Sequence, residues 1–85
     1  MKSFKYVIKD EIGLHARPAG LVAKVAKEVS SKVTITCNGK SAEATRLMAL
    51  IGLGAKCGNE VTVTIEGDDE EKAAAVMEKL FHENL

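Results

Sequence analysis

VTITCNGKSAEA, residues 33–44, is the stretch that decides the fold of this chain. Apolar side chains alternate with threonines as far as Cys37, which predicts a strand with one buried face and one wet face. Asn38-Gly39 follows, and this pair is the strongest short hairpin signal, because both central residues of a type I′ turn need positive φ. Residues 40–44 are therefore predicted to return as a short antiparallel strand.

The same kind of pattern on either side of this hairpin predicts the remaining elements. Apolar residues occupy every second position in residues 4–8 and again in residues 61–65, which predicts two more strands. Helical spacing predicts helices over residues 16–29 and 47–51 and a last helix that opens at residues 68–71. The order β-α-β-β-α-β-α is that of an α+β sandwich, in which one sheet face is covered and the other meets water.

Each of the two longer helices has an apolar stripe that is expected to be buried. The stripe of the first helix consists of Ala19, Val22, Ala23, Ala26 and Val29. The stripe of the last helix consists of Ala73, Val76, Met77, Leu80 and Phe81. Asp68 is expected to cap this last helix, with Glu71 three residues further on as in a capping box.

The composition is that of a small water-soluble protein. The 85 residues predict one domain, residues 1–85, with an apolar share of 46% and a formal net charge of zero. Zero charge and 4% aromatic residues give no argument for a nucleic acid or an anionic membrane as partner. No apolar run approaches the roughly 18 residues that span a bilayer, so membrane insertion is not expected. Two cysteines without a CxxC pair fit a reducing compartment, so we expect a cytoplasmic monomer.

GLHARPA, residues 13–19, lies where the first helix should begin. The first N–H groups of a helix have no internal acceptor and together carry about half a positive charge, which favours anions there. His15 is expected at or near the N-cap, and the amides of Ala16 and Arg17 should be free to meet an anion. Pro18 is tolerated in a first turn, where its missing N–H breaks no helical bond, and it stiffens the turn.

This combination suits phosphoryl transfer through a histidine. An imidazole is nucleophilic only when neutral, and a positive helix end favours the neutral form. Transfer of a phosphoryl group needs mainly positioning and charge stabilisation, which Arg17 and the free amides can supply. A histidine near a helix start can equally be a plain cap or surface residue, and that alternative stays open on these grounds alone. The two histidines and two cysteines show no metal-ligand spacing.

GLHARPA after a first strand resembles the active-site signature of the HPr family, the histidine-containing phosphocarriers of the bacterial sugar phosphotransferase system. The chain length, the order of elements, the Asn38-Gly39-Lys40 hairpin and the Leu47-Met48 helix extend the resemblance over the whole chain. The resemblance implies a four-stranded antiparallel sheet with three helices on one face. It implies that His15 is phosphorylated on Nδ1 by enzyme I and passes the group to IIA domains of sugar permeases. It assigns Arg17 to the phosphoryl group and implies no cofactor, and such a carrier is stoichiometrically modified rather than an enzyme.

The resemblance also implies an exposed apolar patch on the short second helix, beside the histidine. Leu47, Met48 and Ile51 are the candidates, and Met48 is expected to be the most exposed of them. Leu47 and Ile51 can equally belong to the core. Lys24 and Lys27 lie on the Arg17 side of the first helix, where they form either a basic rim for acidic partners or an ordinary solvated face.

One position departs from the family pattern, because in many Gram-positive HPr proteins a regulatory serine begins the second helix. Arg46 occupies that place here, preceded by Thr45, so the serine-kinase switch has no acceptor hydroxyl at residue 46. An alternative function is a regulatory docking module of the same fold that acts on transcription factors or metabolic enzymes. The presence of both His15 and Arg17 favours the carrier, because a docking protein needs no nucleophile. A metal carrier is disfavoured because the loop holds no CxxC.

Overall fold

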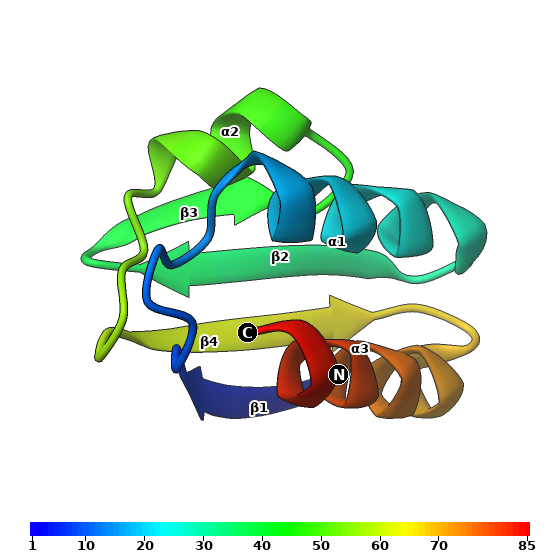
Figure 1. Ribbon diagram of the computed structural model, residues 1–85. Coiled ribbons are helices and arrows are strands. Elements are labelled where there is room, and N and C mark those ends of the chain that lie inside the picture. The colour runs from blue at the N-terminus through cyan, green and yellow to red at the C-terminus, as the bar shows by residue number, and fades with distance from the viewer.

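The computed structural model describes all residues from Met1 to Leu85 and confirms the predicted order of elements. Four strands and three helices alternate along the chain as Figure 1 shows. Their bounds are β1 Lys2–Val7, α1 Ala16–Glu28, β2 Lys32–Cys37, β3 Lys40–Glu43, α2 Leu47–Gly52, β4 Glu60–Glu66 and α3 Glu70–Asn84. None of the helices combines the length and apolar character that crossing a membrane requires.

The strands form one antiparallel sheet in the order β1-β4-β2-β3. The predicted hairpin joins β2 to β3, with Cys37 opposite Lys40. Asn38 and Gly39 have φ values of 55° and 76°, so both central residues of the turn have the positive φ that a type I′ turn requires. The hairpin places β2 and β3 at one end of the sheet, and β4 then inserts between β1 and β2.

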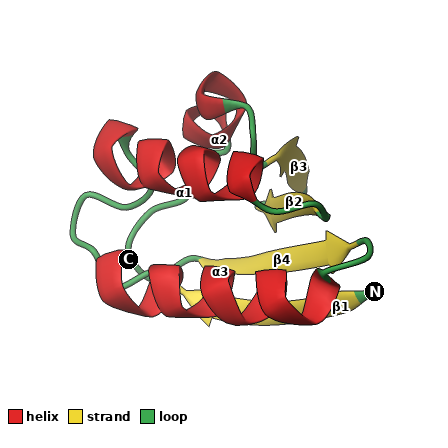
Figure 2. Cartoon of the chain, turned by 90° about the vertical axis from the view of Figure 1, so that its right-hand side faces the viewer, coloured by secondary structure: helices red, strands yellow, loops and turns green.

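All three helices lie on the same face of this sheet, which Figure 2 shows from the side. Alternate residues of β2 and β4 point toward the helices and are buried, as Ile35 and Val63 illustrate. The residues between them are threonines on the opposite face, where Thr34 pairs with Thr64 and Thr36 with Thr62 across the strands. The sheet is therefore open to solvent on its threonine face, as the alternation predicts.

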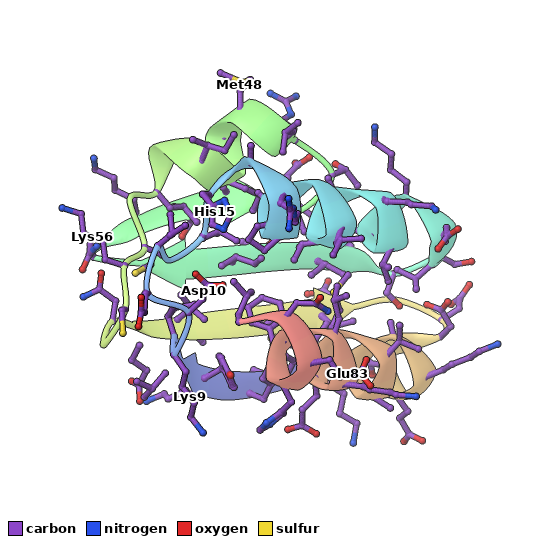
Figure 3. All side chains as sticks on the ribbon, viewed as in Figure 1. Lys9, Asp10, His15, Met48, Lys56 and Glu83 are labelled. Carbon is purple, nitrogen blue, oxygen red and sulfur yellow. The ribbon has the colours of Figure 1, made fainter.

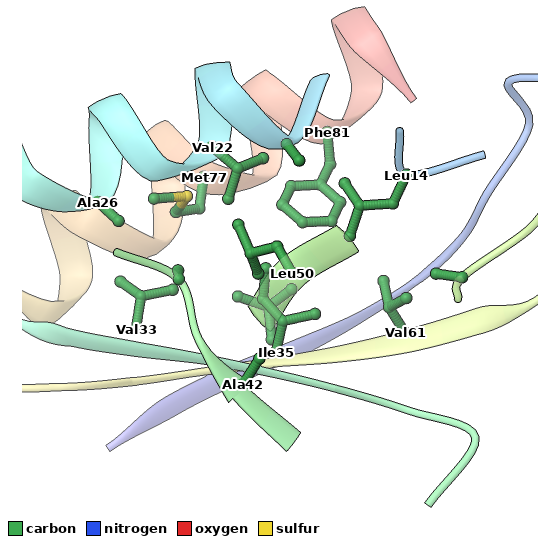
Figure 4. Packing of buried hydrophobic residues seen from close by; sticks show 14 of the residues in the cluster. Leu14, Val22, Ala26, Val33, Ile35, Ala42, Leu50, Val61, Met77 and Phe81 are labelled. Atoms are coloured by element: carbon green, nitrogen blue, oxygen red, sulfur yellow. The ribbon is translucent and has the colours of Figure 1, made fainter. Parts of the chain in front are cut away.

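The core is a cluster of 22 buried apolar residues between the helices and the sheet (Figure 4). Phe81 of α3 is fully buried and makes edge-to-face contacts with Phe4 and Tyr6 of β1. The buried side of α1 is largely alanine, and these short side chains allow the helix backbone to lie close to the sheet. Leu50 is the only residue of α2 that is buried, so the rest of that helix remains at the surface.

Two expectations for the last helix are wrong. Its N-cap is Asp69 rather than Asp68, and the Asp69 carboxylate forms no bond to the helix itself. The carboxylate instead accepts hydrogen bonds from the backbone N–H of Ser30 and from the Ser31 hydroxyl. It therefore joins the segment that follows α1 to the beginning of α3. Val76 is 38% exposed because it lies at the edge of the stripe that Ala73, Met77 and Phe81 define at intervals of four residues.

The bonds to Ser31 and Ser30 lower the pKa of the Asp69 carboxyl below its ordinary value of 3.8, because they stabilise the charged form. A lowered pKa in the folded state stabilises the fold fully above the ordinary value, and this contribution disappears as the pH falls through the lowered pKa. Asp69→Asn should therefore lower the Tm at neutral pH, and its difference from the wild type should shrink below about pH 4. Thermal unfolding followed by circular dichroism between pH 2 and 7 measures this.

Asp68→Asn is the matched control, because Asp68 is exposed and forms no side-chain hydrogen bond or ion pair. Its Tm should follow that of the wild type at every pH. A Tm difference for Asp69→Asn that does not change with pH would contradict the role assigned to the Asp69 charge.

Candidate functional site

The chain between β1 and α1 is held in one conformation by backbone and side-chain hydrogen bonds. The Asp10 carboxylate accepts a hydrogen bond from the Ile12 N–H at 2.9 Å, and the Asp10 carbonyl accepts one from the Gly13 N–H at 3.0 Å. The amides of Lys9 and Asp10 both donate to the Leu85 backbone oxygen at the end of α3. Because this loop is fixed at both ends, the residues that follow it enter α1 from a defined direction.

Gly13 is the point at which this loop touches the segment after α2. Its φ is +84°, a conformation that L side chains rarely adopt. A Cβ at this position would overlap the carbonyl oxygen of Ala55 and lie 2.8 Å from the Cα of Lys56. The next residue, Leu14, donates its N–H to the same Ala55 oxygen at 2.9 Å and buries its side chain in the core. Only glycine fits this crossing.

His15 is the N-cap residue of α1. Its backbone is extended, with φ −99° and ψ −172°, and its carbonyl accepts the first helical hydrogen bond, from Ala19. The ring does not cap the helix, and its side chain is 33% exposed at the surface (Figure 3). The amides of Ala16 and Arg17 make no hydrogen bond, and Pro18 has no N–H. Two unpaired donors at a positive helix end therefore lie immediately after the imidazole.

The ring borders a shallow depression of about 210 Å³. The depression is lined by residues from the loop, from α1 and from the end of α3, namely Asp10, Ile12, His15, Arg17, Pro18, Leu21 and Asn84. Arg17 lines it together with His15 and has no ion-pair partner, so its guanidinium is available to an anion. The site is thus open to solvent and contains a nucleophile, a fixed positive charge and free amides.

The predicted contact residues lie at the surface of α1 and α2, and Lys27 lies in the last turn of α1, at the end of the helix opposite His15. Met48 is 77% exposed and projects from α2 into solvent in Figure 3, and Leu47 is 39% exposed. Ile51 is partly buried against the core, so it is intermediate between the two alternatives. Lys24 and Lys27 are exposed on α1, and α2 packs against α1.

Arg46 is the N-cap residue of α2, and its side chain is 75% exposed. Its Nε lies 3.9 Å from Glu43 Oε2, a surface contact of small energetic effect. The beginning of α2 therefore presents a guanidinium where a hydroxyl would be needed to accept a phosphoryl group.

Four of the residues that line the depression are not predicted from the sequence. Asp10 carries a recognisable signal, since an aspartate two or three residues before a glycine often closes a turn on its own backbone. Ile12 and Leu21 carry no signal beyond being apolar residues at the surface. Asn84 comes from the other end of the chain, and only the packing of α3 brings it to the site.

The cysteines lie away from this depression. Cys37 is buried, and burial raises the pKa of its thiol, so the reactive thiolate is disfavoured. Cys57 is exposed and donates a weak hydrogen bond to the Lys9 carbonyl, with 3.7 Å between sulfur and oxygen. No group of three or more His, Cys, Asp or Glu side chains is arranged to hold a metal ion.

Comparison with known proteins gives consistent matches. The family model described as the PTS HPr component phosphorylation site matches residues 2–83. The phosphocarrier protein HPr of Mycoplasma capricolum subsp. capricolum is 38% identical over 73 residues, which are 86% of this chain and 82% of that protein.

Solved structures agree with the sequence matches. The crystal structure of HPr-C-His from Thermoanaerobacter tengcongensis has a TM-score of 0.90 at 38% identity and covers 96% of this chain and 92% of that chain. The catabolite repression containing protein Crh of Bacillus subtilis, a dimer with a swapping domain, has a TM-score of 0.77 at 32% identity and covers 100% and 98%. The family model and the full-length relatives together show that this chain belongs to the HPr family, the phosphoryl carriers of the phosphotransferase system, which are not themselves enzymes.

Proposed function

We propose that His15 is the residue that carries the phosphoryl group, bonded through Nδ1. The observation that supports this most is the position of the imidazole at the N-cap of α1, directly before two unpaired amides and beside Arg17. His82, the other histidine, lies in α3 with its ring against Tyr6, where no unpaired helix-start amides are available. His15 is therefore the histidine whose surroundings suit a phosphoryl group.

The surroundings of His15 suit both states of the carrier. A phosphoryl group on the ring has two negative charges, which the amides of Ala16 and Arg17 and the positive end of α1 stabilise. The Arg17 guanidinium adds charge-assisted hydrogen bonds to the phosphoryl oxygens. Arg17 is exposed and without an ion-pair partner, so it can move with the group as it passes from donor to acceptor.

We propose that enzyme I is the donor and that IIA domains of sugar permeases are the acceptors. At about 210 Å³ the depression is smaller than the pockets that usually bind drug-sized ligands, which favours specificity from the surface around it. We assign this role to the exposed apolar residues of α2, with Lys24 and Lys27 farther along α1 as a basic rim, an arrangement that favours acidic partners with an apolar centre. We propose that the carrier acts as a monomer in the cytoplasm.

Arg46 favours the carrier over a regulator that depends on a serine phosphate at the start of α2. A guanidinium accepts no phosphoryl group, and it places a permanent positive charge beside the proposed contact surface. Partners that meet this surface should therefore be acidic near α2.

His15→Ala should abolish labelling by enzyme I and radioactive phosphoenolpyruvate, because it removes the nucleophile. The wild type should acquire a label that is labile in acid and stable in alkali. His82→Ala is the matched control and should be labelled as the wild type is, since it removes the chain's other histidine. Labelling that persists in His15→Ala, or that disappears in His82→Ala, would contradict the assignment.

Arg17→Ala should slow transfer from enzyme I by about tenfold or more, because the transferring group loses its charge-assisted partner. Rapid-quench measurement of the phosphorylated fraction gives the rate. The Tm should remain that of the wild type, because the Arg17 side chain is exposed and forms no ion pair. Lys5→Ala removes a positive charge from the open face of the sheet and should leave the rate unchanged.

Met48→Ser should raise the KM of enzyme I for the carrier by about three- to thirtyfold and leave kcat nearly unchanged, because it removes apolar area that only binding buries. Val7→Ser is the matched control, since Val7 is 46% exposed and lies on the sheet rather than on α2. Equal KM values for the wild type and Met48→Ser would exclude Met48 from the contact surface.

A further inference from the structure

Asp10 lies beside the imidazole and has no part in the function proposed so far. Its Oδ1 is 3.9 Å from the Nε2 of His15, and both side chains are about one third exposed, 32% and 33%. Figure 3 shows the two side chains on the same side of the molecule, between the loop after β1 and the start of α1. At this separation the carboxylate acts on the ring through its charge rather than through a hydrogen bond.

The position of Asp10 is fixed by contacts other than the one with His15. Oδ1 also accepts the Ile12 N–H at 2.9 Å, and the Asp10 N–H donates to the Leu85 oxygen at 2.8 Å. The carboxylate is therefore held 3.9 Å from Nε2 by contacts that do not involve the ring.

The other groups around the ring do not compete for Nε2. Arg17, on α1, is the only other charged residue that lines the depression, and it opposes a positive charge on the ring. Asn84, from α3, is neutral, and Ile12, Pro18 and Leu21 are apolar. Neither ring nitrogen of His15 makes a hydrogen bond, and Asp10, whose Oδ1 lies 3.9 Å from Nε2, is the one negatively charged side chain among the residues that line the depression.

We propose that Asp10 is a positioning residue for His15: its carboxylate keeps the ring proton on Nε2 and so leaves the lone pair on Nδ1 free to attack. This inference rests on the proposed function, in which Nδ1 receives the phosphoryl group. A histidine ring has one donor and one acceptor nitrogen when neutral, and a nearby carboxylate selects which nitrogen keeps the proton.

The same charge acts during the transfer itself. The Nδ1 lone pair forms a bond to phosphorus, while the bond from phosphorus to the donor's leaving atom breaks and that atom keeps the electron pair. The ring still carries its proton on Nε2 and is now positively charged, and the Asp10 carboxylate stabilises that charge. In onward transfer the N–P bond breaks and its electron pair returns to Nδ1. A ring that is protonated on Nε2 is the better leaving group in this step.

The test compares Asp10→Asn and Asp10→Ala with the wild type. Asparagine keeps an oxygen that can accept the Ile12 N–H, so Asp10→Asn preserves the turn and removes only the charge. Asp10→Ala removes both the charge and the oxygen that accepts the Ile12 N–H. Glu11→Gln is the matched control, because Glu11 is the exposed neighbour, loses the same charge and forms no ion pair.

Two measurements decide the outcome. The ¹⁵N chemical shifts of the ring, recorded on unphosphorylated protein at a pH where the ring is neutral, give the two tautomer populations. Asp10→Asn and Asp10→Ala should both shift the population toward the Nδ1–H form, and Glu11→Gln should not. Transfer from enzyme I should slow by about two- to fivefold in both Asp10 variants, the size expected for a partly exposed charge pair, and this difference should shrink as salt is added.

Asp10→Asn could keep the tautomer populations and the transfer rate of the wild type while Asp10→Ala transfers more slowly. That result would assign Asp10 to the turn alone and overturn the proposal. An equal shift in Glu11→Gln would also overturn it, because the effect would then belong to net charge. If the wild type acquired no phosphoryl group on His15, the proposed function would fail, while the tautomer comparison would still decide whether Asp10 orients the ring.

Discussion

The close contact between Gly13 and the backbone of Ala55 and Lys56 is the constraint on which the rest of the site depends. No side chain fits at this crossing, and the neighbouring amide of Leu14 uses the Ala55 oxygen as its acceptor. The chain must therefore turn at this point, and the residues that follow lead directly into α1. His15 takes the N-cap position because the crossing fixes where the helix begins, and the two free amides follow from that position.

The candidate site offers charge and position rather than enclosure. A domain of 85 residues has little interior to spare, and its single core of 22 apolar residues lies beneath the site rather than around it. What remains at the surface is a helix terminus, one arginine and one carboxylate around a ring that stays about one third exposed. An open arrangement of this kind lets two different proteins reach the same nitrogen in turn, which a carrier requires.

The sequence predicts the architecture well because its local signals are strong and agree with one another. Asn38-Gly39 requires a tight hairpin, and the alternation of β2 and β4 separates core residues from threonines without help from distant contacts. The errors arise where tertiary packing decides between neighbouring residues. Asp69 is the N-cap instead of Asp68 because its carboxylate bonds to the end of α1, a contact that helix-capping rules cannot foresee.

The residues of the candidate site divide in the same way. His15 and Arg17 follow from the motif and the physics of a helix start, since both lie within one turn of each other along the chain. The relation between Asp10 and His15 depends on how the loop of residues 8–15 folds back, and Asn84 reaches the depression only because α3 ends there. Residues that a site recruits from distant segments leave no periodic or spacing signal of their own.

The threonine face of the sheet has a practical consequence. It lies on the opposite side of the sheet from all three helices (Figure 2), and Thr62 and Thr64 of this face do not line the depression at His15. A fluorophore or an immobilising linker attached there would leave the solvent-exposed side of the imidazole accessible to partner proteins. Single carriers tethered by this side could then be watched through repeated loading and unloading cycles.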